Sequence, residues 1–430
     1  MNAPRTPRKV AGSALTTPHF LLLFSAMLVA AAGNTALQSV MPAIGRAVGV
    51  ADFWVAIAYT WSAVLWVALA PYWAEKSDHH GRKALTMVGL TGFVVSMALC
   101  GLVLVGGLKG WMSAPLTFSL FAMFRAIYGG LGCATPSATQ AYLASKTRRS
   151  ARTGALSALS SSFGLGTIVG PALAPLFVLP FVGLPGPLFA FALIGVAVLL
   201  AVLKWLPNDL KGEREGRGAA MSYPSIASMI TGASVRAATS PTRQKRLSWR
   251  DPRIRRWIVA GVTAGHSQAA SLTCIGFFII DTLKLPPIAA QGPISIVMMA
   301  GAAGTLAAQW GIIPRLNFAP RSLIIWGSIV AAVGLAMTLI AGDLYGLVLG
   351  FAVTSIGFGF TRPGFTSGAS LAVPLAEQGG VAGVITSANG ISYILAPGVG
   401  MALYGIDPHL PFAVCTAIAL ALAVLGRRMA

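Results

Sequence analysis

Charge is what this sequence has least of. Asp, Glu, Lys and Arg make up only 10% of its 430 residues, whereas 56% are hydrophobic. A typical soluble domain has about 25% charged residues. The composition therefore excludes a soluble globular protein and predicts a chain that crosses a lipid bilayer many times.

The sequence also lacks groups that bind metals or carry out catalysis. Its four cysteines, Cys100, Cys133, Cys274 and Cys415, stand singly in apolar segments, without a CxxC or Cys/His spacing. We therefore expect no metal and no cofactor. None of the eleven Asp and Glu residues lies near the middle of a predicted helix. This argues against a carboxylate proton relay at the bilayer midplane, and against a membrane enzyme, which would need a nucleophile and base at that depth.

Twelve apolar segments are long enough to cross the hydrocarbon core, which takes about 20 residues in a helix. They span 19-45, 53-73, 84-107, 115-144, 152-180, 183-206, 256-282, 288-313, 321-341, 344-373, 379-404 and 408-426. We predict an all-α membrane protein of twelve transmembrane helices, with an N-terminal six-helix bundle at 1-206, a basic linker at 207-255 and a C-terminal six-helix bundle at 256-430.

Basic residues alternate between the two faces of the predicted bundle. Of the 31 Lys and Arg residues, 26 fall in the termini and in every second connection, twelve of them between Lys204 and Arg256. The opposite face has only Arg46, Lys109 and Lys284. Because Lys and Arg are retained in the cytoplasm during insertion, we expect cytoplasmic termini in a cell inner membrane. The same pattern explains the net charge of +20 without a nucleic-acid partner.

The two halves also share sequence. GLGCATP at 130-136 is echoed 227 positions later by GFGFTRP at 357-363, and GLGTIVGP at 164-171 is echoed 226 positions later by GISYILAP at 390-397. Near-equal offsets at two places indicate a duplicated six-helix unit. In such proteins the substrate site forms between the repeats near the bilayer midplane.

The connection after the second segment reads AEKSDHHGRK at 74-83. It resembles the loop signature of the major facilitator superfamily, although Ala74 replaces a glycine and His79 a basic residue. The matching positions are Asp78, Gly81, Arg82 and Lys83. The resemblance implies a fold of two pseudo-symmetric six-helix bundles, and a cytoplasmic latch at these four residues that breaks when the bundles rock.

Three further motifs narrow the resemblance. Arg125 and Gly129 match the Arg-x-x-x-Gly motif of proton-linked members. On the fifth segment, Gly166, Gly170 and Pro171 resemble the motif of the superfamily's exporters, with Ala174-Pro175 in place of its closing glycines. The first segment, from Asn34 through Gln38 to Ile44, is similar to that of twelve-helix drug:proton antiporters, which often carry an acid where Asn34 stands.

Five polar residues are the candidate lining of a substrate cavity: Asn34, Gln38, Arg125, His266 and Arg362. A central charge costs about 2.5 to 3.5 kcal/mol on insertion scales, so the arginines should face a wet cavity or a partner. Without central carboxylates they predict an electropositive cavity for anionic or zwitterionic substrates. The alternatives are a structural Arg125, an Arg362 that reaches the membrane surface, and a His266 that only packs between helices.

These observations predict a secondary active transporter that exports small amphipathic or anionic molecules by alternating access, coupled to protons. The alternative is an uptake carrier for organic anions on the same fold. The resemblance implies that helices one, four, seven and ten line the cavity. Candidate proton carriers are His266, Asp78 and a group on the substrate. We expect a monomer whose partners are the lipid bilayer, a small-molecule substrate and the proton.

Overall fold

The computed structural model describes residues 17–147, 149–208, 248–316, 318–374 and 377–428. Most of the predicted linker lies outside these ranges, so the predicted domain boundaries stay a prediction. Every element named below is a helix.

Twelve spans form, as the hydropathy pattern predicts. The first six are α1 (Thr17–Val48), α2 (Asp52–His80), α3 (Arg82–Leu108), α4 (Ala114–Ile127) with its continuations η1 (Tyr128–Gly132) and α5 (Ala134–Lys146), α6 (Arg149–Leu173) with η2 (Ala174–Phe177), and α7 (Gly186–Trp205). The second six are α9 (Pro252–Leu283), α10 (Pro287–Leu306) with its continuations η4 (Ala307–Ile312) and α11 (Ile313–Leu316), α12 (Pro320–Ile340), α13 (Leu344–Leu371), α14 (Gln378–Ile406) and α15 (Leu410–Arg427). Nine spans within the described residues are long and apolar enough to cross a membrane.

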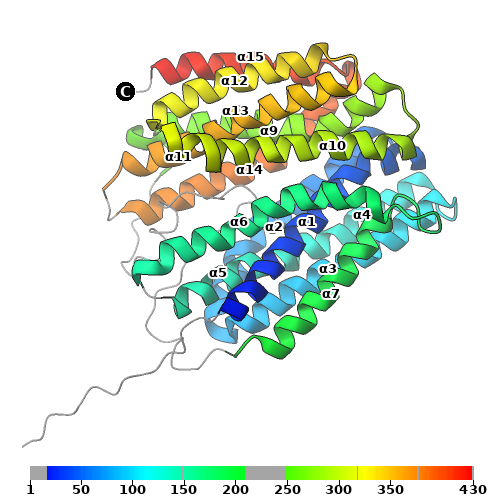
Figure 1. The fold of residues 1–430 in the computed structure, drawn as a ribbon, viewed down its shortest axis with the longest axis horizontal. Helices are drawn as coiled ribbons and strands as arrows, with labels where there is room; N and C mark the ends of the chain where they lie inside the picture. Colours follow the sequence, from blue (N-terminus) through cyan, green and yellow to red (C-terminus); the bar gives the residue numbers. More distant parts are fainter. Residues whose placement is uncertain (1–16, 148, 209–247, 317, 375–376, 429–430) are drawn as a thin grey trace, which may run out of the picture.

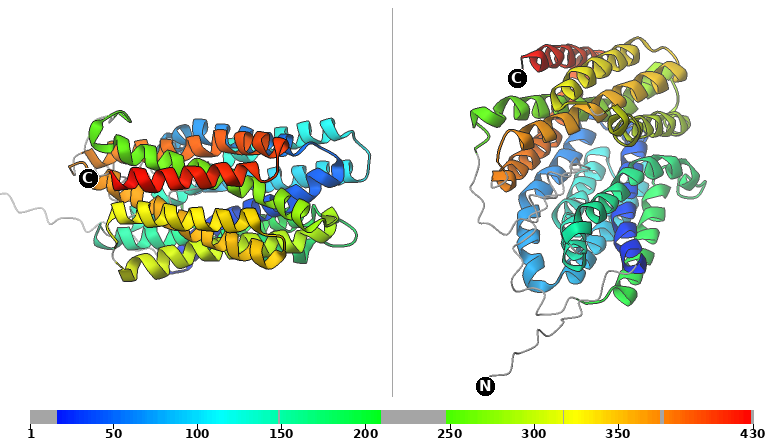
Figure 2. Two further views of the ribbon diagram at one scale, coloured as in Figure 1. Left: turned by 90° about the horizontal axis from the view of Figure 1, so that it is seen from above. Right: turned by 60° about the vertical axis from the view of Figure 1, so that its left-hand side comes forward.

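The helices form two groups, α1 to α7 and α9 to α15, which lie side by side (Figures 1 and 2). In both groups the helices run roughly from one face of the molecule to the other. The groups meet where α2 packs on α14 and where α1 and α6 pack on α10. The α2–α14 crossing is close, because a Cβ added at Gly390 would lie 2.9 Å from Val67 Cγ2. The predicted arrangement of two six-helix bundles is confirmed.

Within the first group, α6 lies directly on α1 through the two glycines of the predicted exporter motif. A Cβ added at Gly166 would lie 2.6 Å from the Cβ of Ala31. At Gly170 it would collide with Ala32 O and Thr35 Oγ1. Thr35 Oγ1 also donates a hydrogen bond to Gly166 O at 3.1 Å. These glycines therefore bring the two backbones together, as small residues do between membrane helices.

The fourth span is interrupted where its counterpart in the second group is not. The π-helix η1 begins three residues after Arg125, whereas α13 stays α-helical from end to end. Side chains of α2 bind carbonyls here: Ser62 Oγ donates to Arg125 O at 3.3 Å and Trp73 Nε1 to Gly130 O at 2.6 Å. The duplicated sequence therefore adopts two different local structures.

The predicted latch lies at the junction of α2 and α3. Gly81 has a φ of 95°, a conformation that side chains rarely tolerate, and it separates the two helices. Arg82 is buried, and Lys83 Nζ donates to Leu203 O of α7 at 2.8 Å. The Asp78 side chain lies outside the described part of the chain, so its role in a latch stays a prediction.

Gly170→Ala should destabilise the protein, because the added methyl group would collide with the α1 backbone. We expect a loss of about 1–3 kcal/mol, typical of overpacking, measured by thermal unfolding of the purified protein in detergent. Gly292→Ala is the matched control: Gly292 lies in α10 and nothing would contact its added Cβ within 4 Å. Equal stability of the two variants would contradict the proposed helix contact.

Candidate functional site: a cavity between the two helix groups

A cavity of about 100 Å³ lies between the two helix groups. Helices α1, α2, α4 and η1 line it from one group, and α9, α10 and α14 from the other. Its polar lining consists of Asn34, Gln38, Tyr59, Ser62, Arg125, Tyr128, Thr273 and Tyr393. No Asp or Glu is among its described lining residues. We call this space the central cavity.

Arg125 carries the only full charge among these lining residues. Its side chain is buried, with 2% of the residue exposed, and Nη2 donates a hydrogen bond to Asn34 Oδ1. Nε and Nη1 have no partner in the part of the chain that the structure describes. The rings of Tyr128 and Tyr59 lie 4.5 and 5.6 Å from Cζ. Arg125 is thus held by an amide and two aromatic rings, while its positive charge has no anionic partner among the described residues.

The structure brings three of the five candidate residues together. Asn34 and Gln38 are one turn apart on α1, and both face the cavity with Arg125. Arg362 lies instead in a second cavity between α9, α13 and α14, and Tyr393 lines both spaces. His266 lines neither of them, and its Nδ1 lies 2.8 Å from Val262 O, one turn back on its own helix.

The lining helices also differ from those that the resemblance implied. Spans one, four and seven (α1, α4 and α9) contribute as expected, but span ten (α13) contributes to the second cavity. Helices α2, α10 and α14 also line the central cavity, which the sequence did not predict. A signal was present in α2: Tyr59, Ser62 and Trp66 are spaced by three and four residues, which places them on one helical face.

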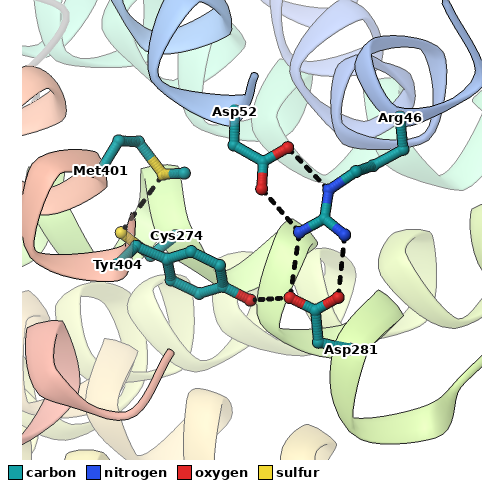
Figure 3. A network of polar contacts seen from close by, with 6 residues as sticks. All are labelled: Arg46, Asp52, Cys274, Asp281, Met401 and Tyr404. Carbon is teal, nitrogen blue, oxygen red and sulfur yellow. Dashed lines mark hydrogen bonds and ion pairs between the residues drawn. The ribbon is translucent and has the colours of Figure 1, made fainter. Parts of the chain in front are cut away.

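An ion-pair network joins the two groups on the face opposite the basic connections (Figure 3). Arg46 at the end of α1 binds Asp52 of α2 through Nε and Nη2, both at 2.6 Å. Through Nη1 and Nη2 it binds Asp281 of α9, both at 3.0 Å. Tyr404 of α14 donates to Asp281 Oδ2 at 2.6 Å. We call these four residues the outer network.

The outer network lies next to one end of the central cavity. Pro42 and Phe277 line the cavity one helical turn before Arg46 and Asp281, and the Phe277 ring lies 5.8 Å from Arg46 Cζ. The side chains of Arg46 and Asp281 are 31% and 32% exposed. Water therefore screens the pair, and such pairs are worth about 0–1 kcal/mol each. A contact this weak can form and break, as a gate at the end of the central cavity would have to do.

Arg46→Gln should open the cavity toward the outer network. The substitution leaves Asp52 and Asp281 facing each other without a cation, and the two carboxylates repel. In a cysteine-free background carrying Thr273→Cys at the cavity wall, we expect labelling by a membrane-impermeant maleimide to rise severalfold. Asp343→Asn removes an acid that caps α13 on the same face and should leave the rate unchanged. Unchanged labelling in Arg46→Gln would show that the network does not close the cavity.

Comparison with known proteins agrees with this architecture. No curated protein sequence matches the chain significantly. Among solved structures, the human organic anion transporter MFSD10 (TETRAN) superposes with a TM-score of 0.64 at 17% identity, covering 95% of this chain and 99% of the other. A point mutant of the nucleoside transporter NupG gives 0.69 at 13%, covering 95% and 99%. A bacterial homologue of the iron transporter ferroportin, in an inward-facing state, gives 0.67 at 14%, covering 95% and 98%.

These identities are low enough that the likenesses show the fold alone. The sequence itself matches the Major Facilitator Superfamily model over residues 23–319, which is more than half of the chain. The chain is a multi-pass membrane transporter that belongs to the Major Facilitator Superfamily.

Proposed function

We propose that this protein is a secondary active transporter that exports small anionic amphipathic molecules by alternating access, coupled to protons. The observation that carries the proposal is Arg125, a buried cation with two unpartnered nitrogen atoms in a cavity without a described carboxylate.

Electrostatics supports an anionic ligand. A positive charge at membrane depth costs about 2.5 to 3.5 kcal/mol on insertion scales, and an anion at Arg125 would offset part of that cost. Arg125 Nε and Nη1 have hydrogen atoms free to donate to carboxylate or sulfonate oxygens. The rings of Tyr59, Trp66 and Tyr128 line the same cavity and suit an apolar, preferably aromatic, ligand body.

The size of the cavity supports alternating access. About 100 Å³ is available, whereas pockets for drug-sized ligands usually enclose roughly 300–1,000 Å³. A ligand larger than its acidic head would therefore require the two helix groups to separate. The outer network links the groups at one end of this cavity and would break in that motion.

The outer network also supports proton coupling. It contains two carboxylates, Asp52 and Asp281, for one guanidinium, so it has one excess negative charge when both acids are ionised. A single proton would neutralise the network and weaken its hold between α1 and α9. Asp52 and Asp281 therefore join His266 and Asp78 as candidate proton carriers, and of these we favour Asp281, because it bridges the two groups.

Export rests on the motif of the fifth span, here α6. Gly166 and Gly170 press α6 onto α1, which carries Asn34 and Gln38 into the cavity. We further propose that the basic face is cytoplasmic, in the inner membrane. Uptake of organic anions is the second candidate function. The electropositive cavity favours it equally, and one structural neighbour is described as an organic anion transporter.

Substitution of Arg125 should abolish anion binding. We expect 2-naphthoate, but not 2-naphthamide or 2-naphthylmethylammonium, to raise the unfolding temperature of the purified protein. Saturation at a hundredfold excess over the dissociation constant adds about 2.7 kcal/mol. Arg125→Gln should lose this response, whereas Arg255→Gln, which removes an exposed arginine on the basic face, should keep it. Stabilisation by the ammonium compound that persists in Arg125→Gln would contradict an anion site.

A flux assay tests direction and coupling together. Proteoliposomes of fixed orientation would be loaded with 2-naphthalenesulfonate, which stays ionised and crosses lipid poorly. With the basic face inside and the medium more acidic than the interior, we expect the proton gradient to drive the anion out past the outer network, in exchange for protons. Asp281→Asn should reduce this gradient-driven flux at least tenfold while leaving 2-naphthoate stabilisation intact. Flux only toward the basic face would instead establish the uptake alternative.

A further inference from the structure

The second cavity contains three buried hydrogen-bond donor atoms that bind no acceptor among the described residues. Arg362 Nε and Nη2 are enclosed without a partner there, and so is Nδ2 of Asn389, a residue that is only 6% exposed. Both residues line this cavity, with Gln268 and Tyr393. A buried polar group without a partner is costly, so this convergence of donors calls for an acceptor.

Charge narrows the choice of acceptor. No Asp or Glu is among the described residues that line this cavity, so the Arg362 charge is uncompensated. Nε and Nη2 lie along one edge of the guanidinium, which can hold an anion with two parallel hydrogen bonds. A water molecule would accept hydrogen bonds from these donors but would leave the Arg362 charge in place. An anion would accept the hydrogen bonds and also neutralise the charge.

The size and position of the second cavity narrow the choice of acceptor further. The cavity offers about 10 Å³, close to the ~10–15 Å³ that a single water molecule requires. A chloride ion is larger than a water molecule and would enter only with a small outward shift of the lining side chains, whereas a carboxylate attached to an organic body is far too large. All the lining residues belong to α9, α13 and α14, which are parts of one helix group. The site therefore does not form and break as the two groups separate.

We propose that this cavity binds one small inorganic anion of the chloride class, held by Arg362 and Asn389, which is distinct from the transported molecule. The ion neutralises Arg362 inside the second helix group. Tyr393 lines both this cavity and the central one, so the ion lies directly behind a wall of the transport site. A resident anion also leaves Arg125 as the cation available to substrate.

Halide titration of the purified protein tests the proposal. The unfolding temperature would be followed by intrinsic tryptophan fluorescence while sodium gluconate is replaced by sodium chloride or bromide at constant ionic strength. We expect a saturable rise with either halide, on the order of 2 °C or more. Gluconate is too large for the cavity and should produce none.

Substitutions at single residues test where the halide binds. Arg362→Gln should lose the halide-dependent rise. Asn389→Leu removes one hydrogen bond to the ion and should increase the halide concentration at half-effect at least tenfold, a change of about 1.4 kcal/mol. Arg125→Gln should keep the halide response while losing that to 2-naphthoate. Arg362→Gln should show the reverse. Failure of either proposal is thus visible without failure of the other.

Any of these titration results would overturn the inference: no halide-specific rise in the unsubstituted protein, a rise that survives in Arg362→Gln, a rise lost in Arg125→Gln instead, or competition between 2-naphthoate and chloride for one site. If Arg362→Gln does not fold, Asn389→Leu carries the test. Anomalous scattering from bromide next to Arg362 in crystals would support the site directly, and its absence at saturating bromide would overturn it.

Discussion

The low polarity of the membrane interior is the constraint on which this structure depends. Acids are found at helix ends, where Asp52 and Asp281 share one arginine, whereas the two arginines of the interior, Arg125 and Arg362, have no described carboxylate partner. A buried cation must have either an internal anion or a supplied one. Because no described carboxylate lies beside either residue, we propose both positions as sites for anions that come from outside.

The two sites differ in how they relate to the moving parts. The Arg125 cavity is walled by both helix groups, so it changes shape as the groups separate. The Arg362 cavity belongs to one group and keeps its walls. The first geometry suits a transported ligand, which must be released, and the second suits an ion that stays. Arg46, at the junction of the groups, uses both edges of its guanidinium to join α1, α2 and α9 next to one end of the cavity.

Sequence duplication does not produce structural duplication in detail. The repeated Gly-x-Gly-x-x-x-Pro segments differ in backbone, since η1 interrupts the fourth span and α13 is continuous. Arg125 and Arg362 are not at equivalent positions of the repeat either, and they lie in separate cavities. The two halves have thus diverged in structure: Arg125 of the first half lines the cavity between the groups, and Arg362 of the second half lines a cavity within its own group.

The sequence by itself determined the twelve spans and their two groups, because a helix that crosses a bilayer must be apolar over about 20 residues. It also placed Asn34 and Gln38 on one face of the first span and Arg125 at membrane depth, since helical periodicity and membrane depth are local properties. Only the tertiary structure decided that α2 and α14 line the cavity, that Arg362 has its own cavity, and that Arg46 meets Asp281 across 235 residues of sequence. Those contacts depend on how helices distant in sequence rotate and approach one another, which no local pattern encodes.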